Sequence, residues 1–157
     1  MTLLAFVVAC DASAPTATPA AAGGPIPDLM SADALTQFWT EHTLACDVRE
    51  QRAECRNEDA AQGLVVVTFT WSDGGVSAVT ATIDVSDVAA PERAETIQGF
   101  LAVTVPEMFT SPDVRRAVQN AVRSGLTSGS TTTGVDRVVV DVMRQAERAA
   151  VELTAGE

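Results

Sequence analysis

The side chains best suited to chemistry in this chain are a histidine and two cysteines that lie close together in the sequence. Cys46 and Cys55 stand nine positions apart, and His42 precedes the first of them by four. An even pair of cysteines in an exported protein is typical of a disulfide, whereas all three side chains together could hold a metal ion. Structural zinc needs four ligands, and this spacing matches no standard zinc motif. We therefore predict a Cys46–Cys55 disulfide and no metal site.

His42 is the only histidine of the chain, so catalysis by a serine or cysteine nucleophile with a histidine base would have to use it. It follows Glu41 near the expected end of a helix, where a cation interacts favourably with the helix dipole. We interpret His42 as a residue that ends a helix and not as a catalytic base.

Two groups of carboxylates could perform acid–base chemistry or bind calcium. One group is Asp84 with Asp87, and the other is Glu54, Glu58 and Asp59. Neither group has the spacing of an EF-hand loop or the glycine that such a loop requires. We interpret both groups as solvated acidic surface.

The chain carries none of the short motifs that mark common enzymes. It has no nucleophile elbow, no Walker sequence, no zinc-protease motif and no dinucleotide fingerprint. The segment Ser72-Asp73-Gly74-Gly75 is expected to be a turn and not a phosphate-binding loop, because an expected strand follows it. Trp39 and Trp71 are expected in or beside the core. The sequence thus predicts no catalytic residue and no cofactor. The open alternative is a small-ligand carrier or enzyme with an uncommon carboxylate and histidine site.

A third cysteine, Cys10, follows an apolar run at the start of the chain. Leu3 to Ala9 is uninterrupted and apolar, which is typical of a signal peptide and too short to cross a membrane. The sequence Val7-Val8-Ala9-Cys10 resembles the lipobox of bacterial lipoproteins. The resemblance implies that residues 1–9 are a signal peptide and that Cys10 is lipidated. Met1-Thr2 departs from the pattern, because signal peptides begin with basic residues.

The residues after Cys10 have the composition of a flexible tether. From Asp11 to Pro27 the chain contains four prolines, two glycines and one charged residue. A tether after a lipidated cysteine holds a domain away from a membrane. We therefore expect a lipid-anchored protein of the bacterial cell envelope that faces outside the cytoplasm, with a lipidated cysteine and tether over residues 10–27 and a single domain over residues 28–157.

Charge and composition limit the partners of such a domain. The formal net charge is −11, which argues against nucleic acid and against docking on anionic lipid by charge. No apolar run reaches the ~18 residues needed to span a bilayer. We expect contact with the membrane through the lipid anchor, and a non-catalytic binding or adaptor domain with a protein partner.

The elements that must position these residues are clearest in the middle of the domain. Leu64–Trp71 and Val76–Val85 are rich in β-branched residues and flank an Asp-Gly turn, which predicts a β-hairpin. The polar segment from Cys46 to Cys55 fits two short strands. Ser31 is expected to cap an N-terminal helix. The helical spacing of that segment involves Leu35, Phe38, Trp39 and His42.

Two helices are expected after the hairpin. Pro91 stands at a favoured first-turn position of the first helix, and Pro106 is expected to end it. Ser111 begins the second helix, and Gly125 with the Gly/Ser/Thr stretch from Ser124 to Gly134 is expected to close it.

The C-terminal segment permits two interpretations. Residues 135–153 carry apolar side chains at helical spacing, which predicts one amphipathic helix. The β-branched run Val138-Val139-Val140 and the preceding Gly134 favour instead a hairpin with strands near 135–143 and 148–154. We expect this hairpin to pair with the one at residues 64–85, so that helices cover one face of the sheet and Val139 and Ala150 form a modest patch on the other.

Two resemblances favour the hairpin. The segments GVDRVVVDV and AAVELTAG resemble the ending of uncharacterised bacterial envelope lipoproteins, in which a Val-rich strand and a last strand follow a short helix. The order of helix, strands, helices and two strands resembles type III secretion chaperone-like domains, which implies an α+β fold and transfers no active site. We predict an α+β fold with an N-terminal helix, an antiparallel sheet with a central hairpin, two helices and a C-terminal β-hairpin.

Overall fold

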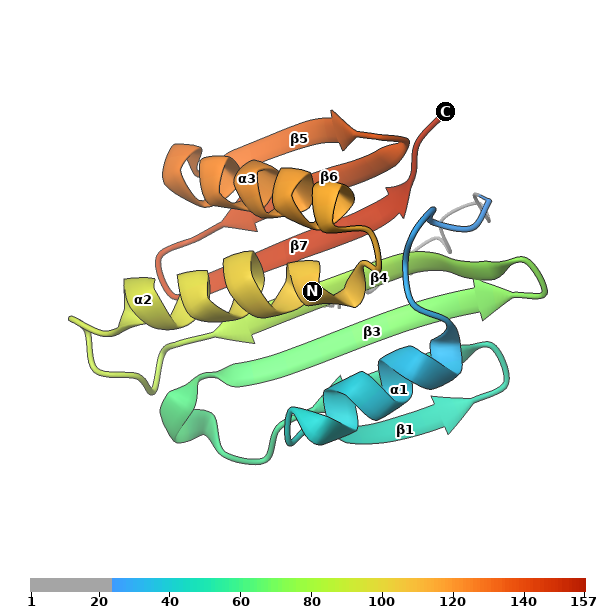
Figure 1. Cartoon of the computed structure of the whole chain (residues 1–157). Helices are drawn as coiled ribbons and strands as arrows, with labels where there is room; N and C mark the ends of the chain where they lie inside the picture. Colours follow the sequence, from blue (N-terminus) through green and yellow to red (C-terminus); the bar gives the residue numbers. More distant parts are fainter. Residues whose placement is uncertain (1–23) are drawn as a thin grey trace, which may run out of the picture.

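The structure, a computed structural model, describes residues 24–157 as helices packed on one antiparallel sheet (Figure 1). The sheet has seven strands in the order β1-β2-β3-β4-β7-β6-β5. The three α-helices lie on the same side of the sheet in Figure 1. The α+β class predicted from the sequence is therefore confirmed, whereas the lipidation of Cys10 and the signal peptide lie outside the described residues.

The strands are β1 (Ala45–Arg49), β2 (Arg52–Arg56), β3 (Leu64–Ser72), β4 (Gly75–Asp84), β5 (Ser130–Val135), β6 (Val138–Arg144) and β7 (Arg148–Ala155). The helices and shorter helical turns are α1 (Ala32–Glu41), η1 (Ala60–Gln62), α2 (Arg93–Gln98), η2 (Gly99–Thr104), η3 (Val105–Met108) and α3 (Pro112–Ser128). None of the helices described for residues 24–157 is long and apolar enough to cross a membrane.

Helix α1 begins where the sequence predicts. The Ser31 side chain accepts a hydrogen bond from the Ala34 N–H at 3.3 Å, which satisfies one of the free donors of the first turn. Leu35 and Trp39 are fully buried, four positions apart on the face that meets the sheet. His42 follows the helix as its C-terminal cap and is exposed to solvent.

The segment between α2 and α3 differs from the predicted single helix. Six residues of α2 continue into the π-helical turn η2 and then into the 3-10 turn η3. Pro106 lies inside η3 and does not end the helix before it, because proline is tolerated in a first turn that needs no N–H from it. Leu101 and Val105 are fully buried, so this irregular segment still covers the sheet.

The end of α3 lies four residues beyond the predicted Gly125. Gly125 lies inside the helix, where a Cβ atom would come within 2.5 Å of the Cβ atom of Val142 on β6. Its missing side chain therefore permits close packing of helix on sheet and does not end the helix. The end is at Gly129, whose φ of 96° is the left-handed conformation that favours glycine.

The stretch expected to be a loop after α3 forms an edge strand instead. Strand β5 is rich in threonine and pairs antiparallel with β6 along its whole length. Asp136 and Arg137, both with positive φ, form the tight turn between the two strands. The C-terminal part of the sheet therefore has three strands where the sequence predicted two.

The C-terminal hairpin itself is confirmed, and the alternative of a single amphipathic helix is wrong. Strand β6 pairs antiparallel with β7, and β7 pairs with β4 of the central hairpin as expected. The side chains that face the helices are fully or almost fully buried. They are Val138, Val140, Val142, Val151 and Leu153.

The N-terminal end of the described chain packs on the sheet. Ile26 is 4% exposed, and its N–H donates to the Val76 carbonyl oxygen at 2.8 Å. The packed part of the chain thus includes Ile26, which the composition of residues 10–27 assigns to the tether.

A candidate binding surface on the sheet

The side of the sheet opposite the helices is not covered by any element described for residues 24–157 (Figure 1). Strand β3 shows the difference between the two sides, since Val65, Val67 and Phe69 are buried whereas Val66 and Thr68 are half-buried. We call the uncovered side of the four central strands the open face. It comprises Leu64, Val66, Thr68, Thr70, Ala78, Thr80, Thr82, Asp84, Val139, Asp141, Met143, Arg148, Ala150, Glu152 and Thr154.

One end of the open face is an apolar hollow. Its lining includes Leu64, Val66 and Met143, and Leu64 and Met143 are 43% and 54% exposed. The hollow has a volume of about 390 Å³; Ala150 adds to its apolar wall, and Asp84, Gln145 and Arg148 line its polar margin. Exposed apolar side chains that gather on one patch are typical of an interaction surface. Ala150, half-buried, contributes to this patch as expected, while Val139 lies at another point of the same face.

The pair of Asp141 and Glu152 lies near the middle of the open face. The two residues are direct neighbours across strands β6 and β7. Neither carboxylate lies within 4 Å of a basic group in the part of the chain that the structure describes. Asp141 accepts one hydrogen bond, from the Thr132 hydroxyl at 3.3 Å. We call these two residues the acidic pair.

Replacing Glu152 with glutamine is expected to stabilise the domain. Like charges directly opposite each other in a sheet are destabilising, so removing one should raise the free energy of unfolding by about 0.2–1 kcal/mol. Urea unfolding near neutral pH measures this change, with Glu95→Gln on the exposed side of α2 as the matched control. A loss of stability in Glu152→Gln would show that the acidic pair does not repel in the folded state.

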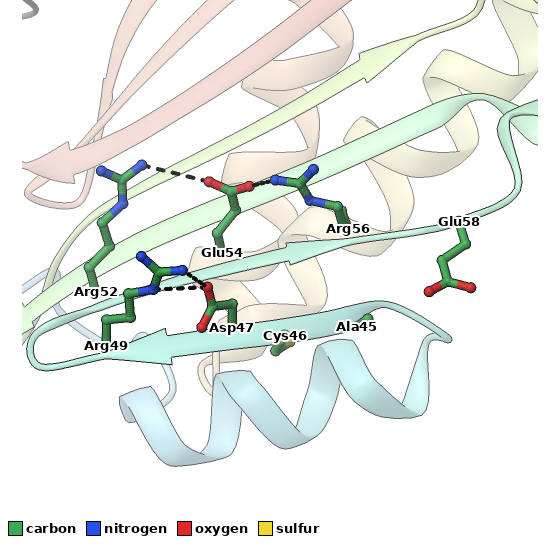
Figure 2. Close-up of a pocket in the computed structure, with 8 residues that line it drawn as sticks. All are labelled: Ala45, Cys46, Asp47, Arg49, Arg52, Glu54, Arg56 and Glu58. Atoms are coloured by element: carbon green, nitrogen blue, oxygen red, sulfur yellow. Dashed lines mark hydrogen bonds and ion pairs between the residues drawn. The ribbon is translucent and has the colours of Figure 1, made fainter.

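Next to the open face, strands β1 and β2 carry a ladder of ion pairs (Figure 2). Arg49 donates to Asp47 at 2.9 and 2.6 Å, and Glu54 lies between Arg52 and Arg56. These side chains line a solvent-open hollow of about 590 Å³. Exposed ion pairs of this kind contribute little to stability. Of the predicted acidic cluster, Glu54 is therefore paired with arginines, whereas Glu58 lies at the margin of the hollow in Figure 2 and the Asp59 carboxylate accepts a hydrogen bond from the Ala61 N–H at 2.9 Å.

Asp84 is held in a network that ends strand β4. Its carboxylate accepts hydrogen bonds from the Ser86 hydroxyl at 2.6 Å, the Ser86 N–H at 2.9 Å and the Arg148 Nε–H at 2.5 Å. The hydrogen bonds from Ser86, followed by that from Arg148, lower the pKa of Asp84 from 3.8 to about 2. This carboxylate is thus engaged in holding the strand end, which argues against the acid–base role considered for Asp84 and Asp87.

Replacing Asp84 with asparagine is expected to remove a pH-dependent part of the stability. Because the folded state lowers the pKa of Asp84, its contribution is present above pH 3.8 and is lost as the pH falls to about 2. The difference in unfolding free energy between wild type and Asp84→Asn should therefore shrink across this window in urea unfolding. Asp87→Asn is the control, because Asp87 is exposed. If the difference in unfolding free energy between wild type and Asp84→Asn stays constant between pH 3.8 and 2, the lowered pKa of Asp84 is contradicted.

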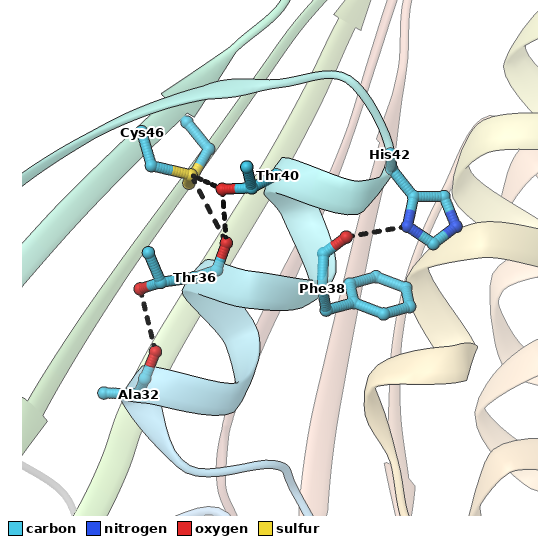
Figure 3. Close-up of a disulfide and its surroundings, with 7 residues drawn as sticks. Ala32, Thr36, Phe38, Thr40, His42 and Cys46 are labelled. Atoms are coloured by element: carbon cyan, nitrogen blue, oxygen red, sulfur yellow. Dashed lines mark hydrogen bonds between the residues drawn. A yellow bond between two sulfur atoms is a disulfide. The ribbon is translucent and has the colours of Figure 1, made fainter.

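The disulfide predicted from the sequence lies at the far edge of the same sheet (Figure 3). The sulfur atoms of Cys46 and Cys55 are at bonding distance, and the two Cα atoms are 4.0 Å apart on neighbouring strands. Figure 3 shows the Cys46 sulfur beside the Thr40 hydroxyl and the Thr36 carbonyl oxygen of α1. The bond therefore joins β1, an edge strand, to the rest of the sheet on the side that α1 covers.

His42 is not close to the open face. Its Nδ1–H donates to the Phe38 carbonyl oxygen at 2.8 Å (Figure 3). Its Nε2 lies 4.0 Å from a Glu107 carboxylate oxygen. The residue lines a groove of about 320 Å³ between α1 and η2, together with Trp39 and Phe100. The carboxylate beside His42 is that of Glu107, and none of the acids singled out from the sequence lines this groove.

No protein-family model, curated protein or solved structure matches the chain.

The sequence did not predict the apolar hollow or the acidic pair. Each of their residues occupies an ordinary alternate position of a strand, and only the register brings β3, β4, β7 and β6 together in that order. The available signal was the alternation in residues 138–144, which separates buried valines from Val139, Asp141 and Met143.

Proposed function

We propose that the chain is a lipid-anchored lipoprotein of the bacterial envelope whose domain binds a protein or peptide on its open face without catalysing a reaction. The observation that carries the proposal is the uncovered side of the seven-stranded sheet with its apolar hollow at Leu64 and Met143. The acidic side chains of the described part also support a binding role. Glu54 and Asp84 are engaged with arginines, and none of the five acids considered for catalysis lines the groove that holds His42.

The expected anchor is compatible with access to the open face. Lipidation of Cys10 is a prediction from the residues Val7-Val8-Ala9-Cys10. The described chain enters the fold at Ile26, which bonds to Val76 at the start of β4. Residues 10–25 of the sequence therefore separate the expected lipid from the first packed residue.

Replacing Cys10 with serine is expected to release the protein from membranes, because a serine hydroxyl cannot form the thioether to diacylglycerol. The gene is expressed in a lipoprotein-processing bacterium from its upstream sequence, and the protein is followed by detergent partitioning and by the mass of the mature chain. Wild type should partition with detergent and begin at a lipidated Cys10. A water-soluble wild-type product with a free Cys10 thiol, or one cleaved elsewhere, would contradict the lipoprotein proposal.

The binding role of the open face is tested by adding bulk and charge at its centre. Thr68 and Thr80 are neighbours across β3 and β4, and both are half-buried. The lipid-free domain is coupled to beads and incubated with a detergent extract of the source envelope. Thr68→Arg/Thr80→Arg should lose a partner that the wild type retains, while Thr127→Arg on the exposed side of α3 should keep it. Equal retention by both variants would contradict a role of the open face.

A small-ligand carrier is the second candidate, and one observation favours it. The indole Nε1–H of Trp39 is buried without a hydrogen-bond acceptor among the described residues. Trp39 also lines the groove between α1 and η2, and binding pockets are typically apolar with a few polar groups. This candidate predicts partner capture that is unaffected by the open-face variants, together with a ligand that quenches Trp39 fluorescence. The same capture experiment therefore distinguishes the small-ligand carrier from the protein-binding domain.

A further inference from the structure

We propose that the segment that binds the open face presents a basic side chain to the acidic pair and an apolar side chain to the apolar hollow. The inference rests on the proposed function, because it specifies the chemistry of the partner for the same face. The occupant is a segment of a partner protein, with lysine or arginine two residues from a large apolar residue in extended conformation.

The charges of the sheet point to a cation from outside the domain. Elsewhere on the same side, the acids have basic partners within the domain, as Asp84 has in Arg148 and Glu54 has in Arg52 and Arg56. The acidic pair has none within 4 Å in residues 24–157, although Asp141 and Glu152 stand directly opposite each other. A basic side chain between them would neutralise the repulsion of two like charges on adjacent strands.

The spacing of the two features fits an extended segment. Met143 follows Asp141 by two residues on β6, and Ala150 precedes Glu152 by two on β7, so both strands step from the acidic pair to the apolar hollow. Two residues of extended chain cover about 6.8 Å, and alternate side chains point to the same side. A partner strand with a basic residue at one position and an apolar residue two positions away therefore matches both features at once.

The charge of the whole chain also favours a basic partner. A net charge of −11 attracts cationic segments and repels acidic ones at long range. At close range the acidic pair would select the position of the basic residue, and the apolar hollow would bury its neighbour. A calcium ion is a weaker fit, because it takes six to eight oxygen ligands and the acidic pair supplies two carboxylates.

Two synthetic peptides test the inference with the wild-type domain. Both are acetylated and dye-labelled, and in both a leucine stands two positions after each charged residue, so that the two side chains share one side of an extended chain. SGKTLTKTLGS carries two lysines where SGETLTETLGS carries two glutamates. Fluorescence anisotropy at physiological ionic strength gives the dissociation constants. We expect the lysine peptide to bind at least tenfold more tightly than the glutamate peptide. Failure of the lysine peptide to bind the wild type would overturn the inference.

Matched variants separate the acidic pair from bulk charge. Asp141→Asn/Glu152→Gln removes two charges from the open face, and Glu92→Gln/Glu95→Gln removes two exposed charges near α2. The first variant should weaken lysine-peptide binding at least tenfold, and the second less than twofold. Met143→Ser should weaken it as well, because it removes an apolar wall of the hollow. Equal losses in the two charge variants would show attraction by net charge alone and overturn the inference.

The native partner distinguishes this inference from the proposed function. If Thr68→Arg/Thr80→Arg abolishes capture but Asp141→Asn/Glu152→Gln captures as well as wild type, the open face binds a partner of other chemistry and the inference is wrong. If both variants retain the partner, the proposed function is wrong as well. Calcium binding by the wild-type domain that is lost in Asp141→Asn/Glu152→Gln would assign the acidic pair to a metal ion and overturn the inference.

Discussion

Replacing Trp39 with alanine is expected to lower the free energy of unfolding by about 3–5 kcal/mol, the range found when a large buried aromatic side chain is truncated. Trp39 is 0% exposed and packs edge-on against Phe38, with ring centroids 4.8 Å apart. Its ring also lies 5.9 Å from that of Phe100, so it joins α1 to η2 as well as to the sheet. Urea unfolding of the lipid-free chain followed by circular dichroism measures the change.

Trp39→Phe is the matched variant. It keeps an aromatic ring in the site and removes a buried N–H that has no acceptor among the described residues. Burying such a donor costs about 1–3 kcal/mol, so its removal should offset part of the lost packing. We expect Trp39→Phe to cost clearly less than Trp39→Ala. Equal costs for the two variants would show that the indole N–H has a partner in solution, which would favour a ligand in the groove.

Replacing both Cys46 and Cys55 with alanine is expected to lower the free energy of unfolding by about 2–3 kcal/mol. The bond joins residues that stand nine positions apart in the sequence. Such a crosslink stabilises the fold because it restricts the conformations of the unfolded chain. It also links the edge strand β1 to strand β2, on which Cys55 is fully buried. The sheet should still form, because β2 to β7 and the three α-helices keep their core.

A reductant supplies the control for the double variant. Dithiothreitol should destabilise the wild type by a similar amount and leave Cys46→Ala/Cys55→Ala unchanged, since the variant has no bond to break. A thiol assay on the native, exported protein should find neither cysteine reactive. Two reactive thiols in the non-reduced protein would show that the bond does not form in the cell.

Local signals in the sequence predicted the central hairpin and the start of α1. The Asp-Gly turn between two β-branched runs is a strong signal because it needs no long-range information, and β3 and β4 pair as expected. Ser31 likewise caps its helix through a contact three residues away. For residues 138–155, β-branching at consecutive valines outweighed a helical spacing of apolar residues, and both strands formed.

The errors arose where tertiary packing decides the local structure. The sequence predicts a helix end at Gly125, but this glycine lets α3 approach Val142 on a strand that comes later in the chain. Strand β5 has no alternation of apolar and polar residues, since its threonines and glycine lie at the edge of the sheet and depend on pairing with β6. The candidate surface has the same origin, because the acidic pair exists only through the register of β6 and β7.

The central claim, binding through the open face, is tested most directly by site-specific photo-crosslinking in the source envelope. A photoreactive phenylalanine derivative replaces Thr80 at the centre of the open face or, as the control, exposed Glu95 on α2. Binding through the open face predicts a discrete crosslinked adduct from position 80, and none from position 95. Adducts from position 95 alone, or no adduct from position 80 in cells that hold the anchored protein, would contradict it.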